Sequence, residues 1–362
     1  MTITTGKAWR VGVLGTGEQA EESRIPSLFA LKDEGLVVAA VADIDHERAR
    51  SIAARFGVPS AYGGLEDMIR GGDLDCVVIT TPHADHAVST ISALRGGLHV
   101  LCEKPMATSV EEAEEMYEAA RRHDRRLAIG YQYEYMVDEA LDVVRSGALG
   151  TLQRVRAKWL RQNGIPDKPS FWLSKQTGGV GADLLGHLLS ALLPLIEGSP
   201  TWTSAQGWRD TGAAIYGEDF AAEDTLAGIV RFDNGVRAHF EVSWAANIPA
   251  KESIDALLVG SEGSLKVPLV GPQLDTEAFR PVLFRREPLD SGGYRIVTEK
   301  VARKPRNTDE CLVAQARNWF RACSGLEPLR SGPEVALTIQ RVLEAVRESA
   351  DHDGGVIGIE GA

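Results

Sequence analysis

Residues 9–20, WRVGVLGTGEQA, decide the fold of the first part of the chain. The apolar run WRVGVL is typical of a buried strand. Gly15, Thr16 and Gly17 follow it directly, and together with Ala20 they complete a G-x-G-x-x-A pattern. The glycines permit a tight turn, and the start of the helix that follows offers unpaired N–H groups to a pyrophosphate. This stretch therefore predicts a strand, a turn and a helix that bind a dinucleotide. A simple strand-to-helix turn is the alternative.

A second apolar run, LVVAAVA, begins at Leu36 and ends just before Asp43. An acidic side chain at the end of the second strand accepts hydrogen bonds from an adenosine ribose, and its charge repels a 2′-phosphate. The next residue is Ile44, whereas an arginine would favour the phosphorylated cofactor. We therefore predict NAD rather than NADP as the cofactor. The alternative role for Asp43 is to cap a helix, and Asp45 is equally well placed for that.

Short apolar runs alternate with amphipathic segments from Arg10 to about Ile129. Strands that alternate with helices in this way form a parallel sheet. We predict that residues 1–130 are an NAD(P)-binding domain of the α/β class, with a doubly wound parallel sheet of the Rossmann type. Beyond the first two strands, the expected elements are strands from Cys76, His99 and Leu127 and helices over 47–57, 86–97 and 110–123.

The pattern changes after about Gly130. Residues 151–160 mix polar and β-forming residues as in a half-exposed sheet, and residues 226–244 place a DNG turn between two β-rich runs. Two helices, at 311–323 and 334–350, close the chain. We therefore predict a second domain, residues 131–362, of the α+β class with an open, mostly antiparallel sheet.

The composition of the chain limits its partners. The 362 residues are enough for about two domains, and 44% of them are hydrophobic, as in ordinary globular proteins. The formal net charge of −12 repels phosphate backbones and anionic lipid surfaces. The longest apolar stretch, LLGHLLSALLPLI, is shorter than the roughly 20 residues that a membrane span needs. We expect no nucleic-acid partner and no membrane partner.

The cysteines and the N-terminus favour the cytoplasm. The four cysteines form no C-x-x-C pair, and Cys76 and Cys102 lie in runs predicted as buried strands. This pattern is typical of a reducing compartment without structural disulfides. The N-terminal residues lack the basic segment and the long apolar run of a secretion signal. We predict a soluble cytoplasmic protein.

Lys104 follows the strand that begins at His99, within the sequence Cys-Glu-Lys-Pro. In doubly wound sheets, ligands bind at the carboxyl ends of the strands. The Lys104 ammonium is therefore placed to donate hydrogen bonds to a substrate oxygen, while Pro105 fixes the local backbone and permits a cis bond. An exposed surface lysine is the alternative.

Asp183 and His187 are a second candidate pair. They are four residues apart in an apolar helix, which puts both side chains on one face, directly after the glycine-rich stretch TGGVGA. A histidine there is able to take a proton from a secondary alcohol, with the aspartate orienting the ring and stabilising the imidazolium. A hydrogen-bonded pair in the core is the alternative.

Two further patterns are less specific. His83 and His86 are three residues apart, but no acidic or cysteine cluster accompanies them, and closed metal sites usually need four ligands. We therefore predict no metal and place these histidines on a loop that lines the cofactor. Aromatic and hydrogen-bonding side chains also interleave in a way that suits a polyhydroxylated ligand, with ordinary packing as the alternative. These are Trp159, Arg161, Gln162, Asn163 and Trp172.

The ordered set of motifs resembles the Gfo/Idh/MocA oxidoreductase family over nearly the whole chain. Besides the glycine fingerprint, the set comprises ADIDHERA, TTPHADHA, CEKP, GYQYEY, TGGVGADLLGH, EDTLAGIVRFDNG and LLVGSEGSLKV. The resemblance implies an NAD(P)-dependent enzyme that oxidises or reduces a hydroxyl of a sugar, an inositol or a related polyol. It also implies a Rossmann domain followed by a substrate-binding α/β domain whose open sheet face supports a homodimer or homotetramer.

The resemblance also assigns roles to individual residues. It places the catalytic lysine, aspartate and histidine at Lys104, Asp183 and His187. The chain departs from the family where Leu185 replaces a frequent glycine, two residues before the histidine, and this leaves the substrate open. The family's cofactor-lining positions fall on Gly15, Thr16, Gly17, Asp43, Thr81, Pro82, His86, Glu103, Lys104, Gln132 and Trp172.

From these inferences we expect an NAD-dependent oxidoreductase. It would transfer a hydride between nicotinamide and a secondary hydroxyl or ketone of a sugar, glycoside or cyclic polyol. Three alternatives stay open: a keto-sugar reductase that uses NADPH, a redox-neutral NAD-dependent enzyme that cleaves glycosides, and a non-catalytic NAD-binding sensor. The sequence does not name the sugar, the carbon that reacts or the physiological direction.

Overall fold

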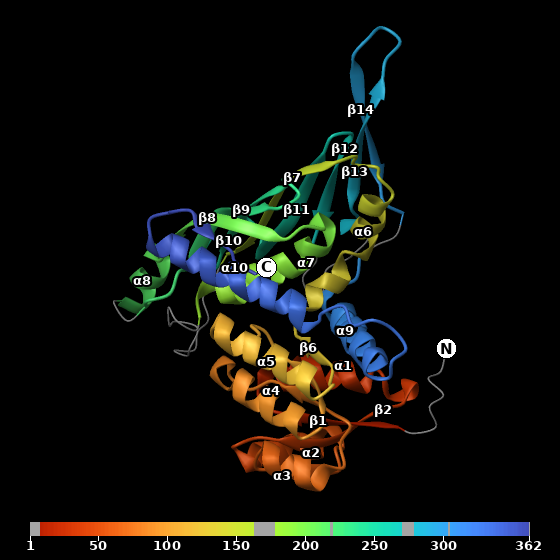
Figure 1. Cartoon of the computed structure of the whole chain (residues 1–362), viewed down its shortest axis with the longest axis vertical. Helices are drawn as coiled ribbons and strands as arrows, with labels where there is room; N and C mark the ends of the chain where they lie inside the picture. The colour runs from red at the N-terminus through yellow and green to blue at the C-terminus, as the bar shows by residue number, and fades with distance from the viewer. Residues whose placement is uncertain (1–7, 163–177, 218–219, 270–278, 303–304, 362) are drawn as a thin grey trace. The chain divides into compact units, whose positions relative to one another are not determined.

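The computed structural model describes residues 8–162, 178–217, 220–269, 279–302 and 305–361 (Figure 1). The chain divides into two compact units. The first comprises residues 1–132 and 309–337, and the second comprises residues 133–308 and 338–362. A segment near the C-terminus therefore belongs to the unit that the N-terminus begins.

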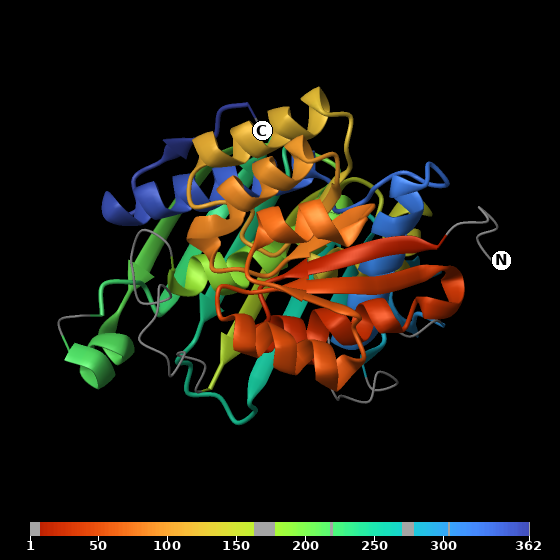
Figure 2. The ribbon, with the colours of Figure 1, turned by 90° about the horizontal axis from the view of Figure 1, so that it is seen from below.

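The first unit contains a six-stranded parallel sheet with the order β3-β2-β1-β4-β5-β6. Helices cover both faces of this sheet (Figure 2). The doubly wound parallel sheet predicted from the sequence is confirmed. The strands are β1 (Trp9–Leu14), β2 (Leu36–Ala42), β3 (Ser60–Tyr62), β4 (Cys76–Ile79), β5 (His99–Cys102) and β6 (Leu127–Ile129). The helices are η1 (Ala20–Arg24), α1 (Ile25–Phe29), η2 (Lys32–Glu34), α2 (His46–Phe56), α3 (Leu65–Gly72), η3 (His83–Asp85), α4 (His86–Arg95), α5 (Val110–Arg122) and α9 (Thr308–Cys323). The short helix η4 (Gln132–Met136) begins at the last residue of the segment 1–132, and its other residues belong to the second unit.

Strand β3 and helix α3 are absent from the sequence prediction. The strand is only three residues long, and all three side chains are half-buried, so it carries no apolar run. It adds the sixth strand by pairing in parallel with the end of β2.

The second unit contains a nine-stranded sheet with the order β14-β13-β12-β11-β7-β10-β9-β8-β15. Among the described strands of this sheet, only β7 and β10 are parallel neighbours, which confirms the mostly antiparallel sheet, and β9 and β10 form the predicted hairpin. The strands are β7 (Leu152–Arg161), β8 (Pro200–Trp208), β9 (Thr225–Phe232), β10 (Arg237–Ser243), β11 (Glu252–Gly260), β12 (Gly263–Pro268), β13 (Val282–Pro288), β14 (Tyr294–Lys300) and β15 (Ile357–Gly358). The helices are α6 (Asp138–Arg145), η6 (Gly181–Leu185), α7 (Gly186–Ile196), α8 (Asp210–Tyr216) and α10 (Pro333–Asp351).

Side chains alternate between buried and exposed along the central strands of this sheet. In β10, Ala238, Phe240 and Val242 are buried, while the residues between them are exposed. The apolar helix α7 packs against β7, and η6, which leads into it, packs against β10. The buried face of the sheet therefore carries the helix on which the predicted aspartate and histidine lie.

The structure also tests for membrane-spanning helices and shows the state of the cysteines. Within the described ranges, no helix combines the length and the hydropathy that a bilayer crossing requires. All four cysteines are free thiols, and burial raises the pKa of Cys102 to about 12.

A buried ion pair joins three distant parts of the first unit. Arg24 in η1 is 1% exposed, and its Nε donates to Oε1 of Glu103, just after β5. Arg24 Nη1 donates to Oε1 of Gln315 in α9 at 2.8 Å, and Gln315 Nε2 donates to the carbonyl of Ile129 at 3.0 Å. Burial raises the pKa of Glu103, but the Arg24 guanidinium outweighs burial and holds this pKa below its ordinary value. The pair ties η1, the end of β5 and α9 to one point.

Replacing Arg24 tests this point directly. R24M leaves the Glu103 carboxylate buried without its cation, and we expect the free energy of unfolding to fall by about 3–5 kcal/mol in urea denaturation at pH 7. A carboxylate with a lowered pKa stabilises the fold above its unfolded pKa, and this contribution is lost as the pH falls through the folded value. The difference between wild type and R24M should therefore shrink in acid. The double variant R24M/E103Q is the control and should lose less stability than R24M. Equal urea midpoints for R24M and wild type would contradict the assignment.

Candidate active site

The turn between β1 and η1 is formed by Gly15, Thr16 and Gly17. Gly15 has a φ of +86°, and a Cβ there would lie 2.8 Å from the carbonyl oxygen of Thr80, so only glycine fits. At Gly17, by contrast, a Cβ would meet no atom within 4 Å in the described part of the chain. Packing within the protein therefore does not explain this second glycine, whereas close approach of a pyrophosphate to the backbone does. The turn fits a dinucleotide.

Asp43 lies at the end of β2 and holds this turn. Its Oδ2 accepts hydrogen bonds from the Thr16 backbone N–H at 2.7 Å and the Thr16 hydroxyl at 2.8 Å, and its Oδ1 accepts from the Asp45 N–H at 2.9 Å. Burial raises the pKa of Asp43, but these hydrogen bonds outweigh burial and lower it overall. Asp45, not Asp43, caps α2, because its side chain accepts from the Arg48 N–H at 3.1 Å. The helix-cap alternative for Asp43 is wrong. The next side chain, Ile44, is 98% exposed.

His86 joins the loop after β4 to the loop after β5. Its ring is fully buried, with Nδ1 2.8 Å from the Pro105 carbonyl oxygen and Nε2 3.0 Å from the Thr81 carbonyl oxygen. Burial lowers the pKa of His86. Both ring nitrogens thus face backbone carbonyls of this chain. The hydroxyl of Thr81 is buried and makes no hydrogen bond within the described residues. Pro82 is exposed.

Lys104 lies beside the buried ion pair. Its side chain is half-buried, and the Lys104–Pro105 peptide bond is cis, the form that the sequence permits. Glu103 accepts a hydrogen bond from the Lys104 backbone N–H at 3.1 Å in addition to its contact with Arg24. Glu103 therefore positions the backbone that carries Lys104. Gln132 is buried, with 8% of its surface exposed.

A cavity of about 420 Å³ lies in the first unit between the start of α3 and one side of α4. The Asp43 N–H donates to the carbonyl of Tyr62, directly before the cavity lining begins, at 3.2 Å. The cavity is thus at the same sheet edge as Asp43. Its lining residues are Gly63, Gly64, Leu65, Glu66, Asp67, Val88, Ser89 and Ser92.

In the second unit, Asp183 lies in the π-helical segment η6, and His187 lies in the first turn of α7. π-Helical segments are rare in proteins, and those that occur are often found at functional sites. Asp183 Oδ2 accepts hydrogen bonds from Arg161 Nη1 and Trp244 Nε1, each at 3.0 Å. Arg161 also donates from Nε to Oε1 of Glu252 at 2.6 Å. Burial lowers the pKa of Arg161, but the carboxylates of Asp183 and Glu252 outweigh burial and raise it. The Asp183 carboxylate is thereby fixed by two donors, one at the end of β7 and one directly after β10.

His187 lies between two aromatic rings. Its ring centroid is 4.9 Å from that of Tyr133 in an edge-to-face arrangement and 5.8 Å from that of Trp159. The side chain is 6% exposed. The Ser190 hydroxyl donates to the His187 carbonyl oxygen at 2.7 Å. The two aromatic rings enclose the imidazole at the start of α7.

The residues that the sequence predicts to contact a polyol differ in where the structure places them. Trp159 is 1% exposed and packs against Tyr133 and His187, so the packing alternative holds and the ligand-stacking interpretation of Trp159 is wrong. Arg161 holds Asp183, and Gln162 is exposed. Asn163 and Trp172 lie outside the described residues.

Three members of the second-unit cluster are absent from the sequence prediction. Trp244 ends the β-rich run after the DNG turn, Glu252 begins β11, and Tyr133 lies in the motif GYQYEY without an assigned role. A tryptophan at the end of a predicted hairpin is the one available signal, because a buried indole N–H needs an acceptor. Nothing in the sequence spacing connects Glu252 to Arg161.

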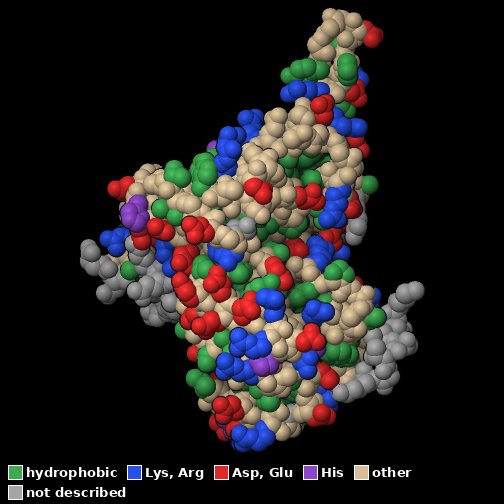
Figure 3. Space-filling view, in the orientation of Figure 1, with side chains coloured by type: hydrophobic (Ala, Val, Ile, Leu, Met, Phe, Trp, Pro, Cys, Tyr) green, Lys and Arg blue, Asp and Glu red, His purple; other side chains and the backbone are tan. Residues whose placement is uncertain are grey.

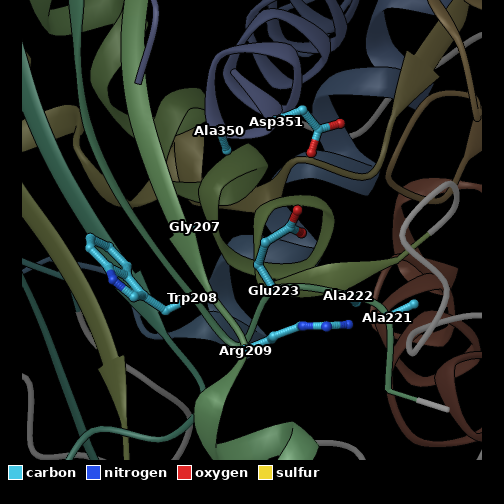
Figure 4. A pocket seen from close by; sticks show the side chains of 8 residues that line it. All are labelled: Gly207, Trp208, Arg209, Ala221, Ala222, Glu223, Ala350 and Asp351. Carbon is cyan, nitrogen blue, oxygen red and sulfur yellow. The ribbon is translucent and has the colours of Figure 1, made fainter. Parts of the chain in front are cut away.

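A second cavity, of about 450 Å³, lies in the second unit at the end of β8 (Figure 4). The carboxylates of Glu223 and Asp351 and the guanidinium of Arg209 are among its lining groups. The Val180 N–H donates to the Glu223 carbonyl at 3.0 Å, directly before η6. The predicted site residues that the structure describes do not line this cavity. Across the described ranges, no group of three or more His, Cys, Asp or Glu side chains is arranged to hold a metal.

A parallel sheet with a glycine turn and a carboxylate at the end of β2 is typical of a dinucleotide-binding domain. Comparison with protein families agrees. Residues 9–131 match the family described as "Oxidoreductase family, NAD-binding Rossmann fold", and residues 137–266 match the "GFO/IDH/MocA C-terminal domain". The chain belongs to the Gfo/Idh/MocA family of oxidoreductases, as its motifs indicate.

Individual relatives are sugar-acting enzymes of this family. The chain is 28% identical over 271 residues to D-glucoside 3-dehydrogenase of Escherichia coli, covering 71% of this chain and 76% of that protein. It is 27% identical over 350 residues to an NADP-dependent D-xylose 1-dehydrogenase of Haloferax volcanii, covering 95% and 98%. A solved structure of levoglucosan dehydrogenase in complex with NADH and L-sorbose superimposes with a TM-score of 0.83 at 20% identity, covering 98% of this chain and 100% of that chain.

Substitutions of His86 test its two contacts separately. In H86N the amide nitrogen falls near the position of Nδ1 and retains the bond to Pro105, and in H86Q it falls near Nε2 and retains the bond to Thr81. A neutral imidazole donates from only one of its two nitrogens, so H86A leaves one of these buried carbonyls without its donor, at a cost of about 1–3 kcal/mol. We expect H86A to unfold at lower urea than whichever of H86N and H86Q keeps the donating nitrogen. The exposed Val88 in the same helix provides the control V88A, which should unfold like wild type. If H86A unfolded at the same urea concentration as wild type, neither contact would contribute to the stability of the fold.

Proposed function

We propose that this protein is an NAD-dependent dehydrogenase that oxidises a secondary hydroxyl of a sugar, glycoside or cyclic polyol, or reduces the corresponding ketone. The observation that carries the proposal is the cluster at the start of α7. There Asp183 is fixed by Arg161 and Trp244, and His187 is oriented by Tyr133 and Trp159. The relatives named above support a carbohydrate substrate, because two of them are dehydrogenases of a glucoside and of xylose.

Each unit contributes one part of the chemistry. NAD, when bound, would supply the hydride acceptor, and the glycine turn and Asp43 are the groups that would hold it. His187 acts as the general base that takes the hydroxyl proton, and as the general acid in the reverse direction. Asp183, one helical turn earlier, supplies a fixed negative charge that stabilises the imidazolium. Lys104 donates a hydrogen bond to the reacting oxygen and stabilises the charge that develops on it.

The catalytic roles predict a loss of turnover without a loss of cofactor binding. We expect K104A and H187A each to lower kcat by about 10²-fold or more, since positioned proton donors and acceptors contribute about 10²–10⁴-fold. The Kd for NADH, measured by fluorescence titration, should stay within about threefold of wild type in H187A, while K104A, altered at a predicted cofactor-lining position, should still bind NADH but more weakly. The exposed Lys300 provides the matched control K300A, which should turn over normally. Retained turnover in K104A or H187A would remove that residue from the mechanism.

The charge of Asp43 favours NAD over NADP. Its carboxylate is held at the end of β2 by three hydrogen bonds, and its lowered pKa keeps it ionised at neutral pH. A 2′-phosphate placed there meets a like charge. The NADP-dependent relative shows that the family also contains the other preference, so the cofactor must be tested in this chain.

Titration calorimetry with the two cofactors decides this point. We expect NAD to bind at least about tenfold more tightly than NADP at pH 7, a difference of about 1.4 kcal/mol. Raising the salt concentration should narrow the gap, because screening weakens the repulsion between the carboxylate and the 2′-phosphate. Equal affinities, or tighter binding of NADP, would favour the NADPH-dependent reductase instead.

A substrate panel tests the reaction itself. Free sugars, inositols, glycosides and levoglucosan are incubated with NAD, and the corresponding ketones with NADH, while absorbance at the NADH band is followed. Growth or loss of NADH with one structural group supports the proposal. Release of an aglycone without net NADH would identify the redox-neutral enzyme. Binding of NAD with no reaction of any substrate would favour the sensor.

A further inference from the structure

Strands β13 and β14 form a ribbon at one end of the nine-stranded sheet. In Figure 1 this ribbon extends past the remaining strands. β14 is the terminal strand, and within the described residues it pairs only with β13. Six of its seven residues are exposed. An exposed edge strand offers unpaired N–H and C=O groups to another strand, and an isolated two-stranded ribbon is marginally stable in water. We therefore expect the exposed edge of β14 to pair with another strand.

Four of the charged side chains on the ribbon form two ion pairs. Arg295 Nη2 lies 2.7 Å from Glu287 Oε2, and Arg285 Nη2 lies 2.7 Å from Glu299 Oε2. On β14, Arg295 and Glu299 stand two residues to either side of Val297, on the same face of the strand. The edge thus carries one cation and one anion at equal distances from a central residue.

This spacing is complementary to itself. If a second copy of β14 lies antiparallel to the first with Val297 opposite the partner's Val297, then Arg295 lies opposite the partner's Glu299. The same contact recurs on the other side of the two-fold axis, as isologous pairing requires. Each contact continues an intrachain pair, so charges of alternating sign run from Glu287 through Arg295 to the partner's Glu299. Opposite charges on directly facing residues stabilise a sheet.

The other face of the ribbon exposes two large apolar side chains. Tyr294 and Ile296 are each 56% exposed, and the guanidinium of Arg286 stacks on the Tyr294 ring at 4.9 Å. In the same register, Ile296 lies opposite the partner's Thr298, so the apolar side chains of both copies gather on one face. Their removal from water adds a favourable term that the single ribbon lacks. Figure 3 shows hydrophobic and charged side chains of both signs together on this ribbon.

We propose that β14 pairs with β14 of a second copy of this chain, antiparallel and centred on Val297, so that the two ribbons form a four-stranded sheet in a two-fold symmetric dimer. The partner strand is assigned to a second copy of this chain because two antiparallel β14 strands place opposite charges at facing positions. This inference concerns assembly and holds whichever substrate and cofactor the enzyme uses.

A charge-swap pair of variants tests the register. In E287R/R295E the first ion pair is reversed, so the ribbon keeps its intrachain contact but places two carboxylates opposite each other in the dimer. In R285E/E299R the second pair is reversed, and two guanidinium groups face each other. We expect each variant alone to have a dimer dissociation constant about tenfold above wild type, measured by analytical ultracentrifugation at low salt. Mixed in equal amounts, the two variants regain opposite charges at both contacts and should form heterodimers with wild-type affinity.

Cross-linking tests the same register independently of charge. V297C places two thiols opposite each other across the two-fold axis, at a separation that a disulfide spans. With oxidised glutathione, V297C should form a covalent dimer on a non-reducing gel. D290C lies in the exposed turn of the ribbon, far from the axis, and should stay monomeric on the gel under the same conditions. A monomeric wild type, unchanged affinity in both charge variants, no rescue on mixing, or equal cross-linking of V297C and D290C would each overturn the proposal.

Discussion

The buried Arg24–Glu103 ion pair is the constraint on which the first unit depends. A charge buried without its partner is strongly destabilising, so η1, the end of β5 and α9 must come together wherever this pair forms. Glu103 then fixes the backbone of Lys104, and Gln315 links Arg24 to the end of β6. One electrostatic requirement thus places the dinucleotide helix and the lysine loop at the same sheet edge, where parallel sheets bind ligands.

A similar principle organises the second unit. The Asp183 carboxylate receives donors from β7 and from the residue after β10, and Arg161 is shared with Glu252 on β11. Three strands and one helix therefore converge on a single carboxylate. The aromatic rings of Tyr133 and Trp159 complete the cluster by packing against His187. In both units, polar side chains at the ends of elements connect segments that are far apart in the sequence.

Local patterns account for much of what could be predicted. The apolar runs gave β1, β2, β4, β5 and β6, and the DNG turn gave the β9–β10 hairpin, because these signals lie within a few residues. β3 escaped prediction since three half-buried residues carry no periodicity. The interpretation of Trp159 failed for a related reason: a tryptophan on a strand has the same sequence signal whether it faces a ligand or a histidine.

The sequence by itself determined the class of both sheets, the dinucleotide turn and the family, because each rests on spacing along the chain. Only the tertiary structure decided which groups meet. It showed that Asp45 rather than Asp43 caps α2, that the ring nitrogens of His86 face two carbonyls, and that α9 belongs with the first unit. Other contacts that only the structure shows join residues much farther apart, such as Asp43 to Thr16, 27 positions away, and Arg24 to Gln315, 291 positions away. Their geometry follows from how whole elements pack, which no local pattern encodes.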